Sequence, residues 1–419
     1  MIDSKLIQEQ PDLVAANNQK RGAKIDISAA QNLLSERSSL IGEVEKLRAQ
    51  GNEIAGQIPK VADEARAALV AEGKNIKDQV KVKDEELNKV QAQLDEELHK
   101  YPNVLREDVP EGSDESANQE MRKIGEPPKF EFEVKDHLEL GENLGLIDVE
   151  RAAKISGSRF AYFKGEFVQL EFALINYVLS VLVPEGFRPV LPPHIISTKA
   201  MRAMGYLDHG GEEEVYHLKN DDAVLIGTSE QAVGPMFMDE MIAGEELPLR
   251  FVAFSPCYRR EAGSYGKDVR GILRMHQFDK LEMFSYVLPE QSDQEHEFLL
   301  AMQERLMQGL KLPYRVMKLS AGDTGAPSAR TYDIETWMPS QNTYRETHST
   351  SNTTDYQSRR LNTRYKNGKE KGYVHMLNGT AFAIGRIMIA IMENYQQAEG
   401  SIEVPDILRP WLGKDKIGS

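Results

Sequence analysis

Arginines and carboxylates alternate with apolar residues between positions 258 and 282. Because successive side chains of a strand point to opposite faces of a sheet, Arg259 and Glu261 are expected on one face. The loop that follows adds Arg270 and Arg274. Guanidinium groups bind phosphate oxygens in pairs and stay charged at ordinary pH, so this set fits a polyphosphate site that Mg²⁺ closes. An ion-pair network on an exposed hairpin is the structural alternative for the same residues.

Three other clusters combine polar groups that could bind a ligand or a metal. Glu346 stands three residues before Ser349, and a carboxylate with a hydroxyl offers the hard oxygen ligands that Mg²⁺ takes together with substrate phosphates. Arg386 lies among small and apolar neighbours, where a charge is rarely buried unless a phosphate or a carboxylate pairs with it. Thr228 and Glu230 follow an apolar run and, taken alone, indicate only the end of a strand.

Several signatures of other chemistries are missing from the sequence. It contains neither G-x-x-x-x-G-K-[ST] nor the Rossmann glycine fingerprint, and neither HExxH nor a cysteine–histidine metal spacing. A serine–histidine–aspartate triad has no G-x-S-x-G motif to support it. The single cysteine, Cys257, excludes an intramolecular disulfide and any zinc site with two or more thiolates.

The chain is acidic and long enough for more than one domain. It has 419 residues, with 51 Lys+Arg against 66 Asp+Glu, which leaves a formal net charge of −15. Because nonspecific nucleic-acid binding is mostly electrostatic, any nucleic-acid contact must use local patches and not the overall field. The most apolar run, residues 172–183, is too short to span a bilayer and is expected to be a buried helix. We therefore expect no membrane segment and a reducing, cytoplasmic environment, which the cysteine usage suits.

Residues 1–101 have the composition and periodicity of a helical arm. They contain no Phe or Trp and only one Tyr, and apolar residues recur at coiled-coil spacing over 33–61 and again over 76–101. The stretch between these runs, 59–75, holds Pro59, which a helix interior does not accommodate. This pattern predicts two long helices folded back on each other as an antiparallel coiled coil, because neighbouring elements tend to pack together. A parallel dimeric coiled coil is the alternative.

The rest of the chain changes character twice. Residues 102–130 are dense in Pro, Gly, Ser and Asp and lose periodicity, which is typical of a linker. Residues 131–419 mix helix and strand patterns and predict an α+β domain with a buried sheet. Strands are expected at 187–193, where prolines indicate an edge or an end, at 250–258 and at 281–287, and a closing helix at 377–395.

The order of these pieces resembles that of seryl-tRNA synthetases, a family of class II aminoacyl-tRNA synthetases, over nearly the whole chain. Residues 187–193 are similar to class motif 1, with Pro189 at the dimer-forming position. Residues 258–261 are similar to motif 2, and residues 378–386 are similar to motif 3. The run from 261 to 282 is very close to the family pattern. The resemblance implies a tRNA-binding arm at 1–101, a linker at 102–130 and, at 131–419, a class II catalytic domain built on an antiparallel β-sheet flanked by helices.

The resemblance also implies an ATP site with three catalytic cations. Arg259 is expected on the α-phosphate and on the serine carboxylate, Arg274 on the outer phosphates, and Arg386 on the γ-phosphate. Glu261 is expected near the adenine, with Phe278 stacked on it. These positions follow from the family motifs, residue by residue.

The expected metal is Mg²⁺, bound with ATP by Glu346 and Ser349. No zinc is expected, because the zinc-dependent branch of the family needs a cysteine ligand and Cys257 lies inside motif 2. Two residues depart from the usual pattern: His348 stands where the family has a small residue, and Thr380 replaces a more usual serine. We expect His348 to point away from the metal site.

The resemblance also implies a serine pocket, in which a carboxylate meets the substrate ammonium and a cation meets the substrate carboxylate. Glu282 is expected to take the ammonium or the hydroxyl, and Thr380 to lie near the hydroxyl. The complete expected set is Thr228, Glu230, Arg259, Glu282, Asn378 and Thr380.

The activity implied is ATP-dependent activation of L-serine to seryl-adenylate, followed by transfer to the 3′ end of tRNA(Ser), and of tRNA(Sec) where the organism has one. The expected partners are tRNA(Ser), held by the arm, and a second copy of the chain in a homodimer. Two alternatives stay open. A carrier-protein-loading paralogue would resemble the catalytic domain without the arm, and a noncatalytic RNA-binding relative should have lost Arg259, Glu282 or Arg386.

Overall fold

The computed structural model of the protein describes residues 1–208, 211–262 and 270–418. They form two compact units: Ile2–Pro102, and Met1 with Asn103–Ser419. The smaller unit contains α1 (Ser4–Glu9), α2 (Pro11–Lys20), α3 (Ile27–Gln57) and α4 (Asp63–His99), with a short 3₁₀ turn at Ile58–Lys60.

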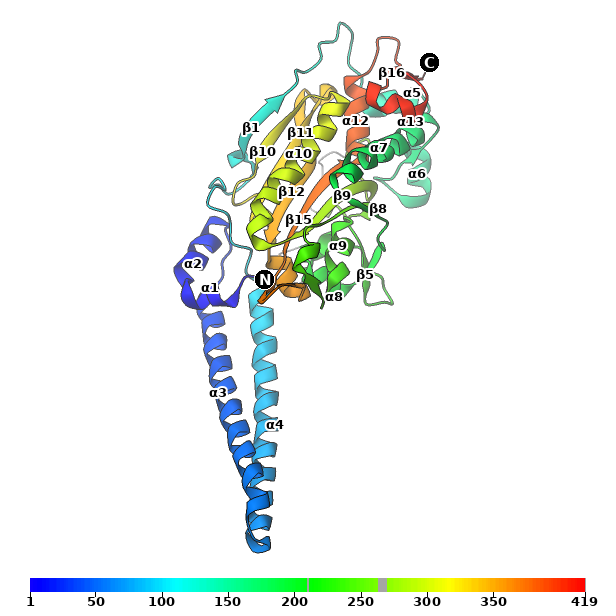
Figure 1. Cartoon of the computed structure of the whole chain (residues 1–419). Helices are drawn as coiled ribbons and strands as arrows, with labels where there is room; N and C mark the ends of the chain where they lie inside the picture. The colour runs from blue at the N-terminus through cyan, green and yellow to red at the C-terminus, as the bar shows by residue number, and fades with distance from the viewer. Residues whose placement is uncertain (209–210, 263–269, 419) are drawn as a thin grey trace. The chain divides into compact units, whose positions relative to one another are not determined.

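Helices α3 and α4 form an antiparallel hairpin (Figure 1). Three contacts between them join Arg37 to Gln91, Arg48 to Asp84, and Glu43 to Lys83. Arg37, near the start of α3, contacts Gln91, whereas the later residues Glu43 and Arg48 contact Lys83 and Asp84, nearer the start of α4, as an antiparallel pair requires. The predicted hairpin is confirmed, and its buried seam consists of Leu34, Leu40, Val44 and Ile54 on α3 with Ile76, Val90, Leu94 and Leu98 on α4.

The turn of this hairpin is shorter than the sequence indicated. Pro59 lies in the 3₁₀ turn, and α4 already begins at Asp63, so most of the stretch 59–75 is helical. Lys83 interrupts the apolar spacing because its ammonium bonds to Glu43 at 3.0 Å and Glu86 at 2.8 Å. Proline therefore ends α3, while the looser apolar spacing after it does not prevent a helix.

The larger unit is built on an eight-stranded sheet in the order β1-β10-β11-β12-β15-β9-β8-β4 (Figure 1). All neighbours run antiparallel except β4 and β8, which are parallel. The strands are β1 (Gln119–Ile124), β4 (Arg188–Val190), β8 (Leu249–Tyr258), β9 (Gln277–Val287), β10 (Tyr314–Lys318), β11 (Arg330–Met338), β12 (Thr343–Thr354) and β15 (His375–Ala383).

Three helices share one apolar core with this sheet: α7 (Glu166–Leu182), α10 (Ser292–Leu310) and α12 (Ile384–Asn394). Each repeats apolar residues at helical spacing, which gives one face to bury. The shorter helices are α5 (His137–Asn143), α6 (Val149–Ser156), α8 (Thr198–Ala203), α9 (Glu230–Val233), α11 (Tyr356–Leu361) and α13 (Arg409–Leu412). Small sheets are formed by β2 (Ile147–Asp148), β3 (Tyr162–Phe163), β5 (Ile195–Ser197), β6 (Ala223–Leu225), β7 (Met241–Ala243), β13 (Arg364–Asn367), β14 (Glu370–Tyr373), β16 (Ile402–Glu403) and β17 (Lys416–Ile417).

The α+β class is confirmed, but two segments differ from expectation. The predicted closing helix at 377–395 begins as strand β15, which pairs with β12 and β9, and becomes helical only at Ile384. An apolar run of this length does not distinguish a central strand from a buried helix. The segment 102–130, expected to be a linker, contributes β1, which pairs with β10 at the edge of the main sheet.

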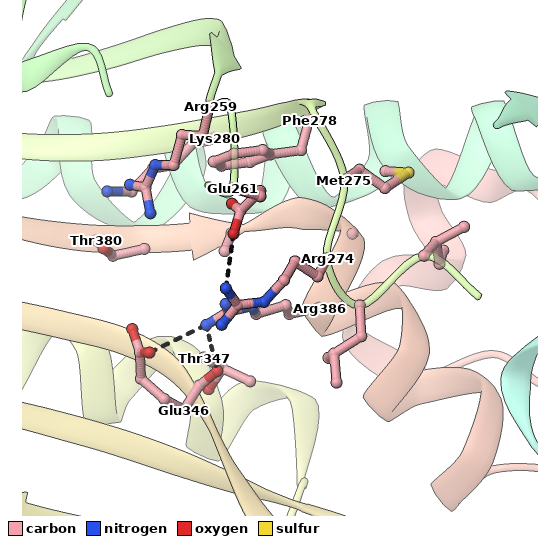
Figure 2. A pocket seen from close by; sticks show the side chains of 14 residues that line it. Arg259, Glu261, Arg274, Met275, Phe278, Lys280, Glu346, Thr347, Thr380 and Arg386 are labelled. Carbon is pink, nitrogen blue, oxygen red and sulfur yellow. Dashed lines mark hydrogen bonds and ion pairs between the residues drawn. The ribbon is translucent and has the colours of Figure 1, made fainter. Parts of the chain in front are cut away.

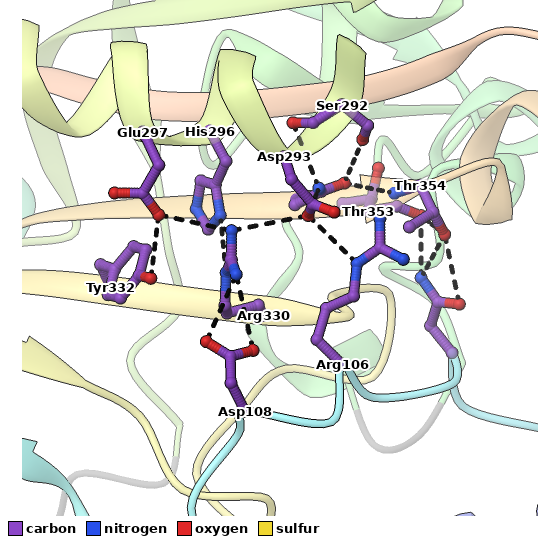
Figure 3. Close-up of polar contacts among 12 residues, drawn as sticks. Arg106, Asp108, Ser292, Asp293, His296, Glu297, Arg330, Tyr332, Thr353 and Thr354 are labelled. Carbon is purple, nitrogen blue, oxygen red and sulfur yellow. Dashed lines mark hydrogen bonds and ion pairs between the residues drawn. The ribbon is translucent and has the colours of Figure 1, made fainter. Parts of the chain in front are cut away.

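An ion-pair network around the buried side chains of Lys318 and Arg330 holds the segment after Asn103 against the sheet (Figure 3). Asp108 bonds to Lys318 on β10 at 2.8 Å and to Arg330 on β11 at 3.3 Å. Arg330 also donates to His296 on α10, whose pKa falls to about 3 because of burial first and the charge of Arg330 second. The network therefore joins this segment to two strands and a helix, with His296 neutral.

One helical stretch, Glu166–Glu185, is long and apolar enough by length and composition to cross a membrane, and it extends beyond the run at 172–183. Its inner face is part of the core: Phe167, Leu170 and Leu174 are completely buried. The core helix of a globular protein has the same composition, so packing accounts for its apolar character.

Candidate active site

A cavity of about 590 Å³ opens over the central strands of the main sheet, within the usual size of a ligand pocket. A second, smaller cavity adjoins it. Seven residues line both: Arg259, Glu261, Arg274, Lys280, Glu346, Thr380 and Arg386. The arginines expected at a polyphosphate site therefore lie at the boundary of two connected spaces.

The three predicted catalytic arginines all contact protein groups at this boundary (Figure 2). Arg274 forms an ion pair with Glu261 at 2.7 Å. Arg386, in the first turn of α12, donates to the backbone carbonyl of Glu346 at 2.8 Å and lies 3.2 Å from its carboxylate. Arg274 and Arg386 each have a carboxylate beside them, so phosphate oxygens would compete with these protein partners.

Arg259 lies at the end of β8, where its Nε donates to the carbonyl of Gly227 at 3.1 Å. Its guanidinium also lies 5.3 Å from the centroid of the Phe278 ring. Strand alternation was predicted to put Arg259 and Glu261 on one face of the sheet. That prediction is wrong, because β8 ends at Tyr258 and Glu261 has a positive φ of 52°. A left-handed residue turns the chain, and the turn rather than strand alternation brings Glu261 to the cavity. Arg270 is exposed and is not among the residues that line either cavity.

Glu346 and Ser349 both lie on β12 and both line the larger cavity. Burial alone would raise the pKa of Glu346, but the charges of Arg386 and Arg259 outweigh burial and hold that pKa below its ordinary value. Among the described residues, no group of three or more His, Cys, Asp or Glu side chains is placed to hold a metal. A site with one carboxylate and one hydroxyl still fits Mg²⁺, which keeps several waters and uses substrate phosphates as ligands.

His348 points away from this site, as its sequence context predicted. It is buried, its Nδ1 lies 2.8 Å from the hydroxyl of Thr347, and its ring is 5.6 Å from that of Phe382. Burial lowers its pKa to about 3, so it is uncharged. Thr380 lines both cavities, next to an irregularity in the pairing of β15 with β9 between Thr380 and Phe382.

The predicted serine-pocket residues come together at one end of the larger cavity. Thr228, Glu230 and Glu282 are buried, with 4%, 3% and 1% of their surface exposed. The side-chain amide of Asn378 donates to Glu230 at 2.7 Å and to Glu282 at 3.3 Å, which bridges the two carboxylates. Burial first, and the charge of Glu282 second, raise the pKa of Glu230 to about 7.

Three residues not predicted from the sequence complete this pocket. Tyr206 donates to Glu230 at 2.9 Å and Gln357 donates to it at 3.2 Å. Lys280 lies 2.6 Å from the Glu282 carboxylate and donates to the Thr228 hydroxyl at 3.3 Å. Its position two residues from both Phe278 and Glu282 on a strand puts it on the same face, so alternation was the signal for it. Nothing local in the sequence indicated Tyr206 or Gln357, which come from distant segments.

The fold and these motifs define a class II aminoacyl-tRNA synthetase. Residues 215–395 match the family model of the tRNA synthetase class II core domain (G, H, P, S and T). Residues 1–105 match the model of the seryl-tRNA synthetase N-terminal domain.

The full-length relatives identify the family within this class. A serine–tRNA ligase of Rubrobacter xylanophilus is 42% identical, covering 100% of this chain and 99% of the relative. The crystal structure of seryl-tRNA synthetase from Pyrococcus horikoshii complexed with ATP has a TM-score of 0.92 at 36% identity, covering 100% and 99%. That of cytoplasmic serine–tRNA ligase from Naegleria fowleri in complex with AMP has a TM-score of 0.87 at 29% identity, covering 100% and 98%. The chain belongs to the seryl-tRNA synthetase family, and the resemblance found in the sequence is confirmed.

Proposed function

We propose that this member of the family activates L-serine with ATP and transfers the seryl group to the 3′ end of tRNA(Ser), and of tRNA(Sec) where the cell contains it. One observation carries the proposal. A face rich in arginines, which suits a triphosphate, adjoins a pocket with two buried carboxylates, which suits an amino acid. Seven residues line both cavities. Adenylate formation requires this adjacency, because the amino-acid carboxylate must reach the α-phosphorus.

In the proposed complex, ATP occupies the smaller cavity and its boundary with the larger one. Phe278 stacks on the adenine, with Glu261 nearby. Arg259 binds the α-phosphate and the serine carboxylate, while Arg274 and Arg386 bind the outer phosphates. Glu346 and Ser349 would hold Mg²⁺, which would supply charge neutralisation at the phosphates. The support is that guanidinium groups bind phosphate oxygens in pairs, that a carboxylate and a hydroxyl are hard oxygen ligands for Mg²⁺, and that all of these side chains line the cavities.

The first step forms a bond between a serine carboxylate oxygen and the α-phosphorus and breaks the bond from the α-phosphorus to the bridging oxygen, which releases pyrophosphate. In the second step the terminal ribose hydroxyl of tRNA attacks the activated carbonyl, loses its proton, and displaces AMP. Neither step uses a protein nucleophile. Cys257 is completely buried and burial raises the pKa of its thiol to about 11, so it is unsuited to that role. The rate would come from positioning and charge neutralisation by arginines.

Serine selection is proposed to occur in the pocket of Thr228, Glu230, Glu282, Asn378 and Thr380. The substrate ammonium meets a carboxylate there, and its hydroxyl meets buried hydrogen-bonding groups. A site built to bind a hydroxyl rejects alanine, because the polar groups of the pocket would have no hydrogen-bond partner when alanine is bound.

The hairpin of α3 and α4 is proposed to hold tRNA, and the chain to work as a cytoplasmic homodimer. The dimer is supported by exposed apolar side chains near motif 1: Leu191 is 79% exposed and Phe172 on α7 is 58% exposed. Large apolar side chains exposed to this degree are the kind of surface that a protein–protein interface would cover.

The decisive experiment is amino-acid-dependent ATP–pyrophosphate exchange, with each of the twenty amino acids and without tRNA. Exchange with serine alone is expected. Exchange with another amino acid would keep the class and contradict the specificity. No exchange with any amino acid would contradict the proposal in favour of a noncatalytic RNA-binding role. Adenylate formation without subsequent charging of tRNA(Ser) would favour a carrier-protein-loading paralogue.

A further inference from the structure

Lys280 is the one lysine among the described residues that line the two cavities. It lies on β9 and keeps only 8% of its surface exposed. Its ammonium is 2.6 Å from one carboxylate oxygen of Glu282 and donates to the hydroxyl of Thr228 at 3.3 Å. Figure 2 shows it, with Arg259, among the residues that line the cavity. Lysines are almost never buried to this degree unless they are paired, so the pairing with Glu282 is the feature to explain.

Two carboxylates share this end of the larger cavity, Glu230 and Glu282, and Asn378 bonds to both. Two buried negative charges that share one hydrogen-bond donor repel each other, which is unfavourable unless cations or further donors compensate them. The partners of Glu230 are the neutral side chains of Tyr206, Gln357 and Asn378. Of these two carboxylates, only Glu282 has an ion pair within the described part of the chain, and its partner is Lys280.

The other cation of the pocket, Arg259, has no ion pair with either carboxylate among the described residues. It donates to the Gly227 carbonyl and packs over the Phe278 ring. Apart from Arg259, which is proposed to bind the substrate carboxylate, the pocket has two carboxylates and one paired lysine, so a single additional positive charge balances them. A substrate ammonium supplies that charge at Glu230, the carboxylate without a cation.

The geometry of Glu282 is determined from both sides. One of its oxygens is held by the Lys280 ammonium and the other by the Asn378 amide. The oxygen that faces Lys280 has an ion pair but no hydrogen bond among the described residues, and the oxygen that faces Asn378 has a second lone pair, so both can still accept a hydrogen bond. A carboxylate held in one orientation is a good acceptor for a hydroxyl but has no favourable contact with a methyl group.

We propose that Lys280 is a positioning and specificity-determining residue of the serine pocket: it pairs with Glu282 and holds it as the acceptor of the substrate hydroxyl, which leaves Glu230 for the substrate ammonium. This inference rests on the proposed function and deepens it, because it assigns the two carboxylates to different groups of serine. Lys280 acts through Glu282 and does not contact the reacting atoms.

The test compares Lys280→Met, Lys280→Arg and wild type in ATP–pyrophosphate exchange with serine and with alanine. Methionine keeps the length of the side chain and removes its charge. Loss of one partner of a buried charge pair typically costs at least about 30-fold in binding, so Lys280→Met should raise the KM for serine by that factor. The KM for ATP should change less than about threefold, and the preference for serine over alanine should fall at least about tenfold. Lys280→Arg should recover most of the serine KM, since it keeps the charge. Isothermal titration with L-serine should show the same order.

The matched control is Lys318→Met. Lys318 is also buried, at 7% exposed, and also pairs with a carboxylate, Asp108 at 2.8 Å, but it lines neither cavity. It should leave the serine and ATP KM values close to wild type. If Lys280→Met does not fold, Lys280→Gln removes the charge but keeps a polar side chain and Glu282, and it should show the same loss of serine preference.

The outcomes separate the inference from the proposed function. If the wild type shows serine-dependent exchange and Lys280→Met has an unchanged KM for serine, the role of Lys280 is overturned and the proposed function stands. A fall in kcat with a raised KM for ATP and an unchanged KM for serine would also overturn it, and would place Lys280 on the phosphates. No serine-dependent exchange in the wild type would overturn the proposed function, and the inference with it.

Discussion

Arg386 and Glu346, 40 residues apart in the chain, meet at the boundary of the two cavities, where the guanidinium donates to the Glu346 carbonyl at 2.8 Å and lies 3.2 Å from its carboxylate. The first turn of α12 thus presents a cation directly to the strand that carries the proposed Mg²⁺ ligands. This contact links the two motifs expected to act on the outer phosphates, and it makes each residue separately testable.

Arg386→Ala should abolish ATP–pyrophosphate exchange while the fold survives. Removal of one preorganised group that stabilises transition-state charge commonly costs about 10²–10³ in rate. Exchange kinetics with serine measure the loss, and circular dichroism with a thermal melt measures the fold. Arg305→Ala is the control, because that arginine is half exposed and pairs with Glu185 at the surface, where such pairs contribute little. Near-normal exchange in Arg386→Ala would refute its assignment to the phosphates.

Glu346→Gln should raise the Mg²⁺ concentration that half-saturates exchange by at least about tenfold, since a neutral amide is a poorer ligand for a hard cation. Manganese binding in the presence of ATP, followed by electron paramagnetic resonance, provides a readout that does not depend on turnover. Glu335→Gln on the neighbouring strand β11 is the control, because Glu335 pairs with Arg315 at 2.6 Å and does not line the larger cavity. Equal metal affinity in Glu346→Gln and wild type would remove Glu346 from the metal site.

Glu230 should make both serine use and stability depend on pH. Its pKa of about 7 means that it is protonated, and unable to balance the substrate ammonium, at lower pH. The kcat/KM for serine should therefore rise with pH by about tenfold per unit below pH 7 and level off above it. A pH profile that is flat between 5.5 and 8 would contradict this role.

The raised pKa of Glu230 also predicts how the free energy of unfolding changes with pH. The folded protein favours the protonated form of Glu230, so its contribution to stability is fully present below the ordinary pKa of 4.5 and is lost as pH rises to about 7. At about 1.4 kcal/mol per pKa unit this loss is about 3 kcal/mol. Glu230→Gln should be more stable than wild type at pH 8 and equal to it at pH 4.5, as measured by urea unfolding. A constant difference between the two proteins at both pH values would show that ionisation is not the cause.

Deletion of residues 27–100 should leave adenylate formation largely intact and sharply weaken tRNA charging. The hairpin can be removed cleanly, because the Tyr101 hydroxyl lies 3.5 Å from the backbone carbonyl of Asp26, so the two ends that remain are close together. Pyrophosphate exchange reports the first step, and aminoacylation of tRNA(Ser) reports the second. Equal loss of both activities would contradict a separate role for the hairpin.

Leu191→Asp should convert the proposed dimer to monomers, because it puts a charge on an apolar side chain that is 79% exposed near motif 1. Sedimentation velocity over a range of protein concentrations measures the change. Ile155→Asp, on α6, replaces a side chain that is 72% exposed elsewhere and should leave the assembly unchanged. A wild-type protein that sediments as a monomer at all concentrations would contradict the homodimer itself.

The hairpin and the arginine-rich segment were predictable because their signals are local. Seven-residue spacing indicates a coiled coil wherever the partner helix lies, and alternation on β9 places Phe278 and Glu282 on one face. The prediction of one helix at 377–395 was wrong because it also used only a local signal. A short apolar run is compatible with a central strand or a buried helix, and only the hydrogen-bond partners β9 and β12 decide between them.

The sequence by itself determined the two-part organisation, the family and the chemical types of the site residues, since these depend on composition, periodicity and motif order. Only the tertiary structure decided which charges meet: Tyr206 and Gln357 on Glu230, Lys280 on Glu282, and Arg386 on Glu346. The physical reason is that the strength of an ion pair or a hydrogen bond depends on distance and burial, and residues separated by tens or hundreds of positions acquire both only when the sheet forms.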